Sequence, residues 1–401
     1  MVALESAARV RPATADELAA ALHEADEHVQ AVTPVGGGTQ LDLGMPPARV
    51  DVLLETTALD RVVEYEPADL TVTVEAGMRF DALQRLLGEN GQFLALDPPA
   101  LEGATIGGLI ATNASGPLRF SYGGPRDLVI GTRVANPDGT LTRAGGRVVK
   151  NVAGYDLNKL YIGSLGTLAV IVELSFKLAP IPPAAATIVG AFSSPDAAGS
   201  AVSAVLRSPL APLAIELLNG QAARGASIGS SVHLALRVGG YPQAVERQVR
   251  DLRRLVEDHA GRPVDAAESA WDDLARMRVD ALQREVVLKA AAPIAHSAAL
   301  VGLLEQRLAE FDPIVWAHAG NGVAYAACSE GISAQALVAL RDAVQQLGSN
   351  ASLVVQRCPT VLKHEVDVWG DAGGALALMR AIKARLDPRN TLNPGRYVGG
   401  I

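Results

Sequence analysis

The alternation of apolar and polar positions predicts a run of short strands and two helices in the first part of the chain. Thr14 and Glu17 have the spacing of a capping box, so we expect an amphipathic helix from there to about His28. A second helix is expected over about 79–88. Apolar or alternating runs bounded by turn residues predict strands near 31–35, 50–54, 70–76, 127–136, 140–143 and 168–178.

Prolines at 180, 182 and 183 interrupt this pattern and indicate a domain boundary. Beyond it the pattern predicts strands at 186–192, 213–218, 231–238, 284–290, 313–317, 322–327 and 351–356. Helices are expected at 195–207, 241–258, 295–310 and 333–346. Because strands and helices do not alternate strictly, we expect an α+β architecture, and the second part is compatible with a duplicated ferredoxin-like sheet.

Composition and charge narrow the class of protein. With 401 residues, of which 49% are hydrophobic, the chain is long enough for two domains with cores. A net charge of −8 argues against nucleic acid or an anionic membrane as partner, so a small acidic substrate would need a local basic pocket. The N-terminal residues lack a basic stretch followed by an apolar core, and we expect a cytoplasmic protein without a membrane span. Two cysteines, Cys328 and Cys358, cannot supply an iron–sulfur cluster.

Three segments rich in small residues stand out within the first domain: 34–40, 97–116 and 154–167. Small side chains allow the backbone to approach a large flat ligand, and three such segments indicate one extended dinucleotide. Gly36 to Gly38 follow an apolar run and could present several N–H groups to a pyrophosphate. The loop matches neither the Rossmann nor the P-loop fingerprint, and taken alone it could be an ordinary tight turn.

Four motifs in this order carry a family resemblance: PVGGGTQ, ATIGGLIATNASGPLRFSYGGPRDLVIG, KNVAGYDLNKLYIGSLGTLAVIVELSFKLAP and LDPRNTLNPGRYV. Together they resemble the p-cresol methylhydroxylase/vanillyl-alcohol oxidase superfamily of FAD-binding proteins, and within it the FAD-binding subunits of bacterial glycolate oxidase complexes. The resemblance covers about residues 1–180 and 370–401. It implies a two-subdomain FAD-binding fold over 1–180, a ferredoxin-like α+β cap domain over 181–374, and a segment over 375–401 that returns to the first domain.

The resemblance also implies which residues hold FAD. They belong to the glycine-rich segments and their neighbours: Val35, Gly36, Gly37, Gly38, Thr39, Gln40, Pro98, Ala104, Thr105, Ile106, Gly107, Gly108, Ala111, Thr112, Asn113, Ala114, Ser115, Gly116, Tyr122, Gly166, Ile171 and Asn393. Arg119 and Asp127 would lie behind them, or be a surface arginine and a structural aspartate. No histidine lies between residues 29 and 232, so we expect the FAD to be noncovalent.

Residues 316–325 resemble an HxGDGNxH element that serves the metal or substrate site in relatives that oxidise 2-hydroxy acids. His318 matches its first histidine, Asn321 stands at the aspartate, and Tyr325 stands at the second histidine. A companion Glu-His-Gly element is missing, so we expect no metal. His318, Tyr325 and Arg357 are the catalytic candidates, with Arg357 or Lys363 able to bind a carboxylate. The histidine could instead be structural, and the two cations could be solvated.

The expected function is therefore that of an FAD-dependent subunit that takes part in oxidising glycolate or a similar 2-hydroxy acid. A catalytic flavoprotein subunit and an iron–sulfur subunit of the same complex would be its partners, and through them it could be peripheral to the inner membrane. Two alternatives remain open. One is a non-catalytic flavoprotein that carries electrons or stabilises the complex, and the other is a stand-alone FAD-dependent oxidase or dehydrogenase, for example of a sugar or lactone.

Overall fold

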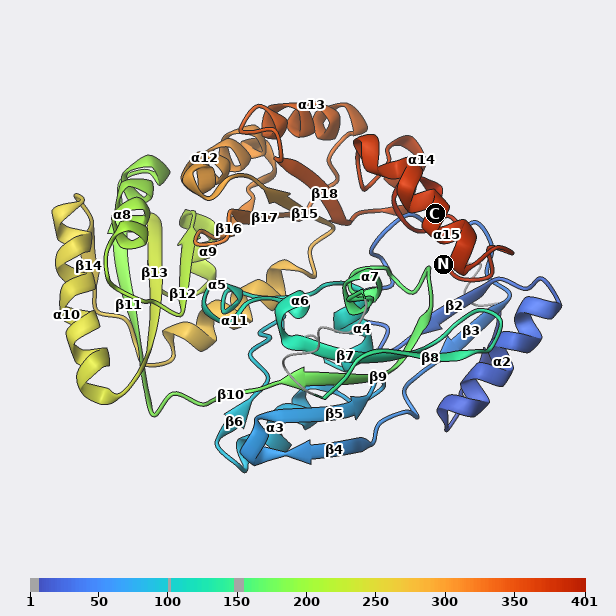
Figure 1. The fold of residues 1–401 in the computed structure, drawn as a ribbon. Helices are drawn as coiled ribbons and strands as arrows, with labels where there is room; N and C mark the ends of the chain where they lie inside the picture. Colours follow the sequence, from blue (N-terminus) through green and yellow to red (C-terminus); the bar gives the residue numbers. More distant parts are fainter. Residues whose placement is uncertain (1–6, 100–101, 148–154) are drawn as a thin grey trace. The chain divides into compact units, whose positions relative to one another are not determined.

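A computed structural model describes residues 7–99, 102–147 and 155–401 of the chain. The chain divides into two compact units (Figure 1). Unit 1 comprises Met1–Ser115, Gly123–Ile181 and Asp371–Ile401, and unit 2 comprises Gly116–Tyr122 and Pro182–Gly370. The C-terminal segment thus belongs to the same unit as the N-terminal one, whereas the short segment 116–122 groups with unit 2. Residues 100–101 and 154 of the glycine-rich segments lie outside the described residues.

Unit 1 contains an antiparallel five-stranded sheet in the order β4-β5-β9-β7-β8. Its strands are β4 (Val62–Glu66), β5 (Thr71–Glu75), β7 (Val129–Ala135), β8 (Leu141–Gly145) and β9 (Val170–Lys177). The alternation expected for residues 70–76 is present, because Val72 and Val74 enter the core while Thr73 hydrogen-bonds Ser175 on the neighbouring strand at 2.8 Å. The helix α3 (Phe80–Gly88) buries Leu83 and Leu87 in the same core. Short helices α4 (Ile106–Ala111), α6 (Pro125–Leu128) and α7 (Asn158–Tyr161), and the paired strands β6 (Gln92–Phe93) and β10 (Ala179–Pro180), complete this part.

A smaller parallel sheet of unit 1 has the order β1-β3-β2, with β1 (Ala8–Val10), β2 (Val32–Val35) and β3 (Val52–Glu55). The helix α2 (Ala15–Glu27) packs against it through Leu18 and Leu22. Thr14 is the N-cap, as predicted, and its Oγ1 accepts a hydrogen bond from Glu17 N at 3.1 Å. The reciprocal bond of a capping box is shifted by one residue, because Glu17 Oε2 accepts from Ala13 N at 2.8 Å. The C-terminal helix α15 (Leu376–Leu386), which the sequence did not predict, leads into the segment that pairs with β2 at Val32.

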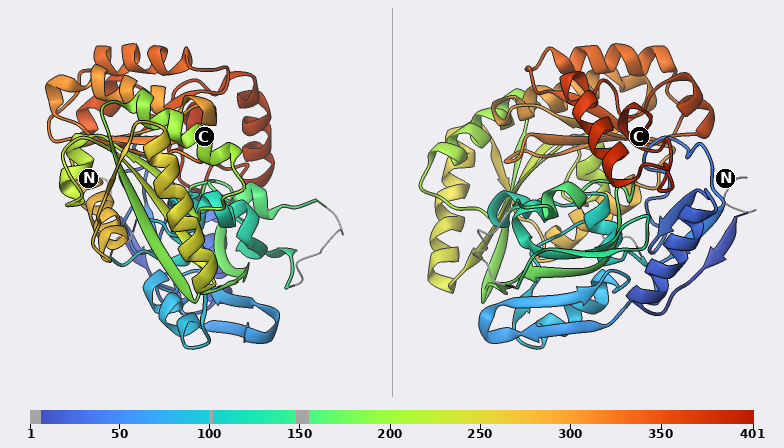
Figure 2. Two further views of the ribbon diagram at one scale, coloured as in Figure 1. Left: turned by 90° about the vertical axis from the view of Figure 1, so that its left-hand side faces the viewer. Right: turned by 45° about the vertical axis from the view of Figure 1, so that its right-hand side comes forward.

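Unit 2 is built on an eight-stranded antiparallel sheet of two similar halves (Figure 2). The strands are β11 (Ala184–Phe192), β12 (Ala214–Leu218), β13 (Val232–Gly240), β14 (Arg262–Val264), β15 (Val286–Ala291), β16 (Ile314–His318), β17 (Val323–Cys328) and β18 (Ser352–Arg357). Their order is β14-β11-β13-β12-β16-β17-β15-β18. Numbered within its own half, each set of four strands has the order 4-1-3-2, which is the ferredoxin-like topology. The duplicated sheet expected from the sequence is therefore confirmed, and β12 and β16 join its halves.

Helices cover both faces of this sheet. One face carries α8 (Pro195–Arg207), α10 (Pro242–Asp258), α12 (Ser297–Arg307) and α13 (Ala334–Gln345). Figure 2 shows α10 lying across the strands of the first half. The other face packs against α9 (Gly220–Gly225) and α11 (Ala270–Ala281), whose alanines and Leu274 meet Trp316 in one core cluster. The remaining helices of the unit are α5 (Arg119–Tyr122) and α14 (Thr360–Glu365).

Two features of the helices correct the sequence-based picture. Residues 97–116 were expected to be a loop, but Ile106 to Ala111 form the helix α4, with Thr105 as its N-cap. Two adjacent glycines disfavour a helix locally, so burial of Ile106 and Ile110 in the core must offset that preference. The helix α11 was not predicted either, because its charged residues obscure the apolar positions Leu274 and Met277 that are buried in the core.

Candidate functional site

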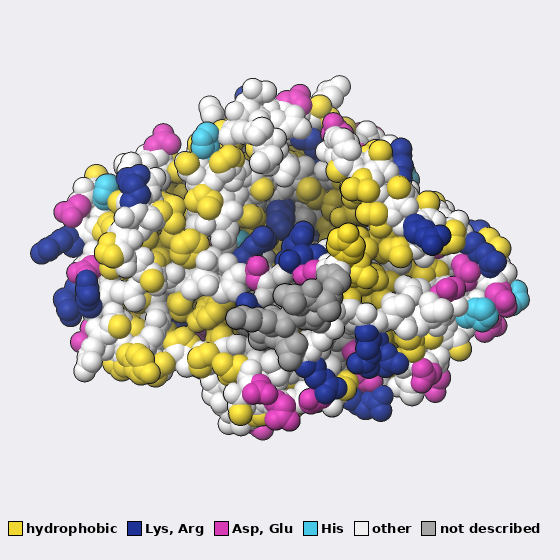
Figure 3. Space-filling view, in the orientation of Figure 1, with side chains coloured by type: hydrophobic (Ala, Val, Ile, Leu, Met, Phe, Trp, Pro, Cys, Tyr) yellow, Lys and Arg dark blue, Asp and Glu magenta, His cyan; other side chains and the backbone are white. Residues whose placement is uncertain are grey.

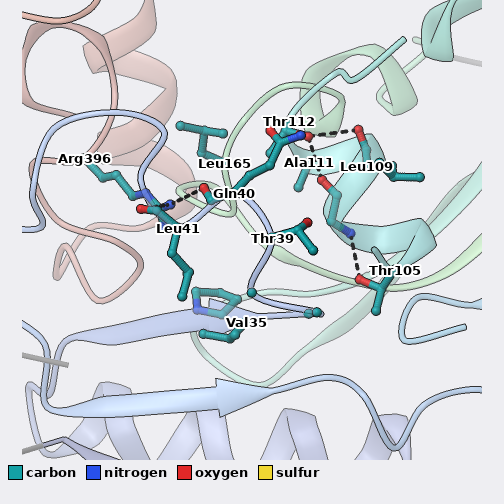
Figure 4. A pocket seen from close by; sticks show the side chains of 15 residues that line it. Val35, Thr39, Gln40, Leu41, Thr105, Leu109, Ala111, Thr112, Leu165 and Arg396 are labelled. Atoms are coloured by element: carbon teal, nitrogen blue, oxygen red, sulfur yellow. Dashed lines mark hydrogen bonds between the residues drawn. The ribbon is translucent and has the colours of Figure 1, made fainter. Parts of the chain in front are cut away.

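Two adjoining cavities open beside the glycine-rich loop of unit 1, with volumes of about 530 Å³ and about 420 Å³. Figure 4 shows the first of them. They share six lining residues: Pro34, Val35, Gly36, Gly108, Ala111 and Leu165. One cavity extends along the loop to Gln40 and Leu41, and the other extends to Gly166 and Ile171. The three glycine-rich segments thus meet around one elongated hollow, as a dinucleotide would require.

The loop 36–40 lines the first cavity and has backbone N–H groups without a partner in the described part of the chain. Among the residues that the structure describes, none accepts a hydrogen bond from the N–H groups of Gly36 to Gln40. Gly38 has φ +72°, the left-handed conformation that glycine adopts without strain. Successive N–H groups around such a residue form an anion-binding nest. The site therefore fits a diphosphate, and no lysine is needed in the loop.

The glycines of this site serve the packing of the protein itself. A Cβ atom at Gly37 would lie 1.7 Å from Gly103 O, and one at Gly36 would lie 2.2 Å from Thr105 Oγ1. At Gly107 it would lie 2.7 Å from the Cβ of Ala76. Sequence reasoning attributed these glycines to the space that the ligand needs, and at Gly37 and Gly107 the packing of the protein itself is a further reason for glycine. At Gly108 the nearest atom is Thr105 Oγ1 at 3.2 Å, and this glycine lines both cavities.

The far wall of the hollow is a turn at Leu165 that is held from two sides. Leu165 has φ +53°, which is uncommon for a bulky residue. Its N–H donates to Ala111 O at 2.9 Å, and its carbonyl accepts from Asn393 Nδ2 at 2.7 Å. Asn393 is 1% exposed and does not line either cavity, so its amide supports the wall from behind.

The structure brings together part of the predicted cofactor set. Thirteen of those residues line the cavities: Val35, Gly36, Gly37, Gly38, Thr39, Gln40, Thr105, Gly107, Gly108, Ala111, Thr112, Gly166 and Ile171. Others lie in unit 1 but do not line either cavity: Pro98, Ala104, Ile106, Asn113, Ala114, Ser115 and Asn393. Ile106 is completely buried in the core. Gly116 and Tyr122, with Arg119, belong to unit 2, whereas Asp127, in unit 1, accepts a hydrogen bond from Gly124 N at 2.9 Å.

Sequence reasoning missed other lining residues, among them Leu41, Thr56, Leu109, Leu165 and Arg396. Arg396 stands directly after the LNPG motif, and this proximity was the only available signal. Its Nε donates to Leu43 O at 3.1 Å, and its Nη2 donates to Gln40 O at 3.2 Å and Leu41 O at 3.0 Å. Figure 4 shows Arg396 reaching the glycine-rich loop from the C-terminal segment.

A cluster of buried polar side chains lies on one face of the unit 2 sheet. Glu216 on β12 is directly opposite His318 on β16. Glu216 Oε1 lies 2.7 Å from His318 Nδ1, and Glu216 Oε2 accepts from Arg278 Nη1 of α11 at 3.3 Å. Glu216 is 0% exposed and its two partners 6% each. A carboxylate at Nδ1 fixes the ring orientation and favours the proton on that nitrogen.

His318 Nε2 has no hydrogen-bond partner among the described residues 7–99, 102–147 and 155–401. Tyr325 packs its ring edge-on to His318, with centroids 5.5 Å apart, and stacks on Trp316 at 5.0 Å. Lys289, on the neighbouring β15, places its Nζ 5.8 Å from the centre of the Tyr325 ring. Two of the three catalytic candidates, His318 and Tyr325, are therefore in contact, and Glu216 and Arg278 are additions that the sequence did not reveal.

The third candidate, Arg357, lies on β18, where it pairs with Val287 of β15. Val287 and Lys289 point to the same side of β15, because side chains alternate along a strand. Arg357 Nη1 donates to Gln283 Oε1 at 3.4 Å. Lys363, the other candidate for carboxylate binding, is buried on α14. The face thus carries His318 and Tyr325 centrally and Arg357 three strands from His318.

Two buried donors close to His318 have no partner among the described residues: Trp316 Nε1 and Asn321 Nδ2. An unpaired buried donor costs about 1–3 kcal/mol, so such groups often await a ligand or an ordered water. Asn321 stands where the resembling element has an aspartate, and its N–H donates to His318 O at 2.9 Å.

Charge on the surface is mixed. On the face shown in Figure 3, basic side chains gather near the middle of the view, whereas acidic and basic side chains are interspersed around the rim. In the part of the chain that the structure describes, no group of three or more His, Cys, Asp or Glu side chains could hold a metal ion. Within the same residues, no helix has the length and apolar character needed to cross a bilayer.

Comparison with known proteins identifies the family. The FAD binding domain family matches residues 6–145, and the C-terminal domain of FAD linked oxidases matches residues 181–347 and 371–397. The chain is 28% identical to glycolate oxidase subunit GlcD of Bacillus subtilis, over 96% of this chain and 88% of that protein. It is 36% identical to glycolate oxidase subunit GlcE of Escherichia coli, over 42% of this chain and 49% of that protein.

Among solved structures, p-cresol methylhydroxylase with substrate bound superposes with a TM-score of 0.76 at 16% identity, over 97% of this chain and 88% of that one. This likeness confirms the predicted α+β, two-domain FAD-binding fold. The chain belongs to the FAD-linked oxidases, and it has the fold of p-cresol methylhydroxylase.

Proposed function

We propose that this chain binds FAD noncovalently and takes part in oxidising glycolate or a similar 2-hydroxy acid to the 2-oxo acid, as the FAD-binding subunit of a glycolate oxidase complex. The observation that carries the proposal is the row of unpaired N–H groups from Gly36 to Gln40, which lines an elongated hollow in an FAD-binding domain. Such a row binds a diphosphate without a metal or a lysine.

The residues that line the two cavities can be assigned to successive parts of a dinucleotide. The loop 36–40 would hold the diphosphate. Gly107, Gly108, Ala111 and Thr112 would border the ribityl chain and the ring, and Gly166 and Ile171 would lie at the adenine end. FAD held by these residues would supply the redox chemistry, as the acceptor of the substrate hydride. The protein has to place substrate and cofactor and to manage one proton.

His318 is the group that would take this proton. Oxidation of a 2-hydroxy acid removes a hydride from the carbon and a proton from the hydroxyl, and Nε2 of His318 is the nitrogen that can receive the latter. Glu216, bound to Nδ1, would hold the ring and stabilise its protonated form. Lys289 and Arg357 would attract the substrate carboxylate, and Tyr325 would orient the substrate beside the imidazole.

The residue types of unit 1 support noncovalent binding. Its described histidines, His23 and His28, lie on and at the end of α2 and line neither cavity. Both cysteines belong to unit 2. Acid precipitation should therefore give a colourless pellet and a yellow supernatant. A yellow pellet would show a covalent flavin and overturn this part of the proposal.

Partner subunits would supply the iron–sulfur cluster. The curated relatives include proteins called subunits of glycolate oxidase, and two cysteines are too few for an iron–sulfur cluster. We therefore propose a catalytic flavoprotein subunit and an iron–sulfur subunit as partners, in the cytoplasm or peripheral to the inner membrane. Dye-coupled oxidation of glycolate, D-lactate and 2-hydroxyglutarate should be slow with the single chain and fast, per flavin, with the co-expressed complex. Equal rates would make the chain a self-sufficient oxidoreductase.

A second candidate function is an electron-carrying or structural flavoprotein subunit. Asn321 and Tyr325 favour it, because they replace two residues of the resembling hydroxy-acid element. Anaerobic addition of each substrate to the single chain separates the candidates. If the flavin absorbance bleaches, the chain itself oxidises the substrate. If it bleaches only in the complex, the chain serves as carrier or scaffold, and if sugars or lactones bleach it instead, the glycolate proposal fails.

A further inference from the structure

Arg396 is the only charged side chain among the described residues that line the two cavities. It is 6% exposed, yet the sequence motifs gave it no function. Removing the charge of an arginine from water is costly, so hydrogen bonds or opposite charges must compensate it. The Arg396 guanidinium donates hydrogen bonds to three backbone carbonyls, those of Gln40, Leu41 and Leu43.

These three bonds anchor the end of the anion-binding loop. The acceptors Gln40 O and Leu41 O lie directly after the N–H groups of residues 36–40, none of which has a partner among the described residues. The arginine is itself held in place by the backbone, since Arg396 O accepts from Met45 N at 3.0 Å and Pro394 O accepts from Ala48 N at 2.7 Å. Gly395, with φ +82°, makes the turn between them.

The charge of this arginine persists under ordinary conditions. Burial lowers the pKa of Arg396 to about 10, and the charge of Asp42 opposes that shift. At neutral pH the guanidinium is therefore protonated. A diphosphate brings two negative charges into the cavity, and backbone N–H groups offer only partial charges against them. A full positive charge in the same wall completes the electrostatic match.

We propose that Arg396 is the positioning residue of the FAD diphosphate site: it holds the loop 36–41 in its binding conformation and supplies the compensating positive charge. FAD affinity then depends on the C-terminal segment, more than 350 residues from the loop in sequence. The inference concerns the cofactor alone, so it can fail or succeed whatever substrate the protein oxidises.

The test is FAD affinity of the deflavinated full-length chain, measured by quenching of flavin fluorescence. Arg396→Met should weaken FAD by at least about 30-fold, equivalent to about 2 kcal/mol. Arg396→Lys keeps the charge but cannot bridge three carbonyls, and should weaken FAD by about 5- to 10-fold. Arg389→Met is the matched control, because Arg389 belongs to the same segment but pairs with Asp26, and it should change the affinity by less than about 2-fold.

A competition assay assigns the effect to the diphosphate. In the unaltered chain ADP should displace FAD far better than adenosine does, and Arg396→Met should remove most of this difference. Unchanged FAD affinity in a folded Arg396→Met variant would overturn the proposal, as would an unchanged ratio of ADP to adenosine. If circular dichroism shows that Arg396→Met does not fold, the same two measurements are made on Arg396→Lys. Unchanged FAD affinity together with an unchanged ratio of ADP to adenosine in Arg396→Lys would then overturn the proposal.

Discussion

Single residues at the cofactor site separate into those that shape the protein and those that face the ligand. Gly36, Gly37 and Gly107 let segments of unit 1 come within contact distance of one another, whereas Gly108 borders the open hollow. Both kinds of glycine look alike in sequence. Substitutions distinguish them, because a side chain at the first kind of position disturbs the apoprotein, whereas one at the second kind disturbs mainly the binding of the ligand.

We expect Gly37→Val and Gly107→Val to lose FAD and also to destabilise the apoprotein, by about 1–3 kcal/mol or more, because each side chain would meet neighbouring protein atoms. Gly108→Val should lose FAD with a smaller change in stability, because its side chain would enter the cavity. Flavin content and urea unfolding of the apoproteins measure the two effects. Normal flavin content in Gly37→Val and Gly107→Val would remove these loops from the site.

His318 and Glu216 allow a test of the proposed chemistry. His318→Ala should slow flavin reduction by substrate about 10²- to 10⁴-fold while FAD content stays normal. Glu216→Gln should slow it less, because the amide can still hold the ring but carries no charge. His296→Ala, at an exposed position of the same unit, is the control. The comparison is made by stopped-flow absorbance in the complex, and unchanged rates in His318→Ala would assign the histidine a structural role.

At the scale of elements, the C-terminal helix and the segment after it behave as one part of the FAD-binding unit. Lys383 Nζ donates to Thr167 O at 2.8 Å and Leu392 O at 2.9 Å, and it pairs with Asp387 at 2.6 Å. The Asp387 carboxylate also accepts from the N–H groups of Thr391 and Leu392. One buried pair thus organises the segment that carries Asn393 and Arg396.

Lys383→Met should destabilise unit 1 by about 3–5 kcal/mol, because it leaves the Asp387 carboxylate buried without its cation. Arg385→Met is the control on the same helix, at an exposed position, and should change stability by less than about 0.5 kcal/mol. Urea unfolding of the apoprotein measures both. Equal stability of the two variants would show that the pair does not organise the segment.

The buried His233 on β13 predicts how the stability of the protein depends on pH. Burial lowers the pKa of His233 below its ordinary value near 6.5, while its Nδ1 lies 2.8 Å from Ser231 O. The unfolded chain then binds a proton at His233 at higher pH than the folded chain, so stability falls as the pH drops below about 6.5. His233→Gln should flatten this decline between pH 7 and 5. His364→Gln, at an exposed position, should leave it unchanged, and two identical pH profiles for His233→Gln and the unaltered chain would refute the assignment.

At the scale of the whole molecule, two units with different chemistry share one chain. Unit 1 contains the anion-binding loop and the elongated hollow, and unit 2 contains the buried Glu216–His318–Arg278 cluster. The predicted domain limits at 180/181 and 374/375 remain a prediction about separately folding parts. The grouping of residues 116–122 with unit 2 has a local cause, because Phe120 packs within 2.5 Å of where a Cβ of Gly320 would lie.

The molecule as a whole should bind no catalytic metal, because the resembling histidine element keeps only His318. Elemental analysis of the purified protein should find less than about one divalent metal per chain. The comparison with His318→Ala checks the ligand set. Stoichiometric zinc or manganese that disappears in this variant would mean that the histidine is a metal ligand and that the proposed base is wrong.

Local signals were enough to predict many elements of this chain. The helix α8 has the predicted limits, Pro195 and Arg207, because Ser194 caps it and Pro195 suits its first turn. Much of the succession of elements in unit 2 was predicted as well, since strand, helix, two strands and helix recur in both halves, but the short strand β14 and the helix α9 were not predicted. Motif order was enough to indicate the family and most of the loop that surrounds the candidate diphosphate site.

Tertiary structure alone decided which residues meet. Glu216 and His318 are 102 residues apart and face each other only because β12 and β16 join the two halves of the sheet. Gln40 and Arg396 are 356 residues apart and meet because the last segment pairs with β2. Hydrophobic periodicity records which side of an element is buried, but it carries no information on which element lies opposite. The sequence by itself therefore determined the elements and the loops of this protein, and long-range packing decided the partners of its buried charges.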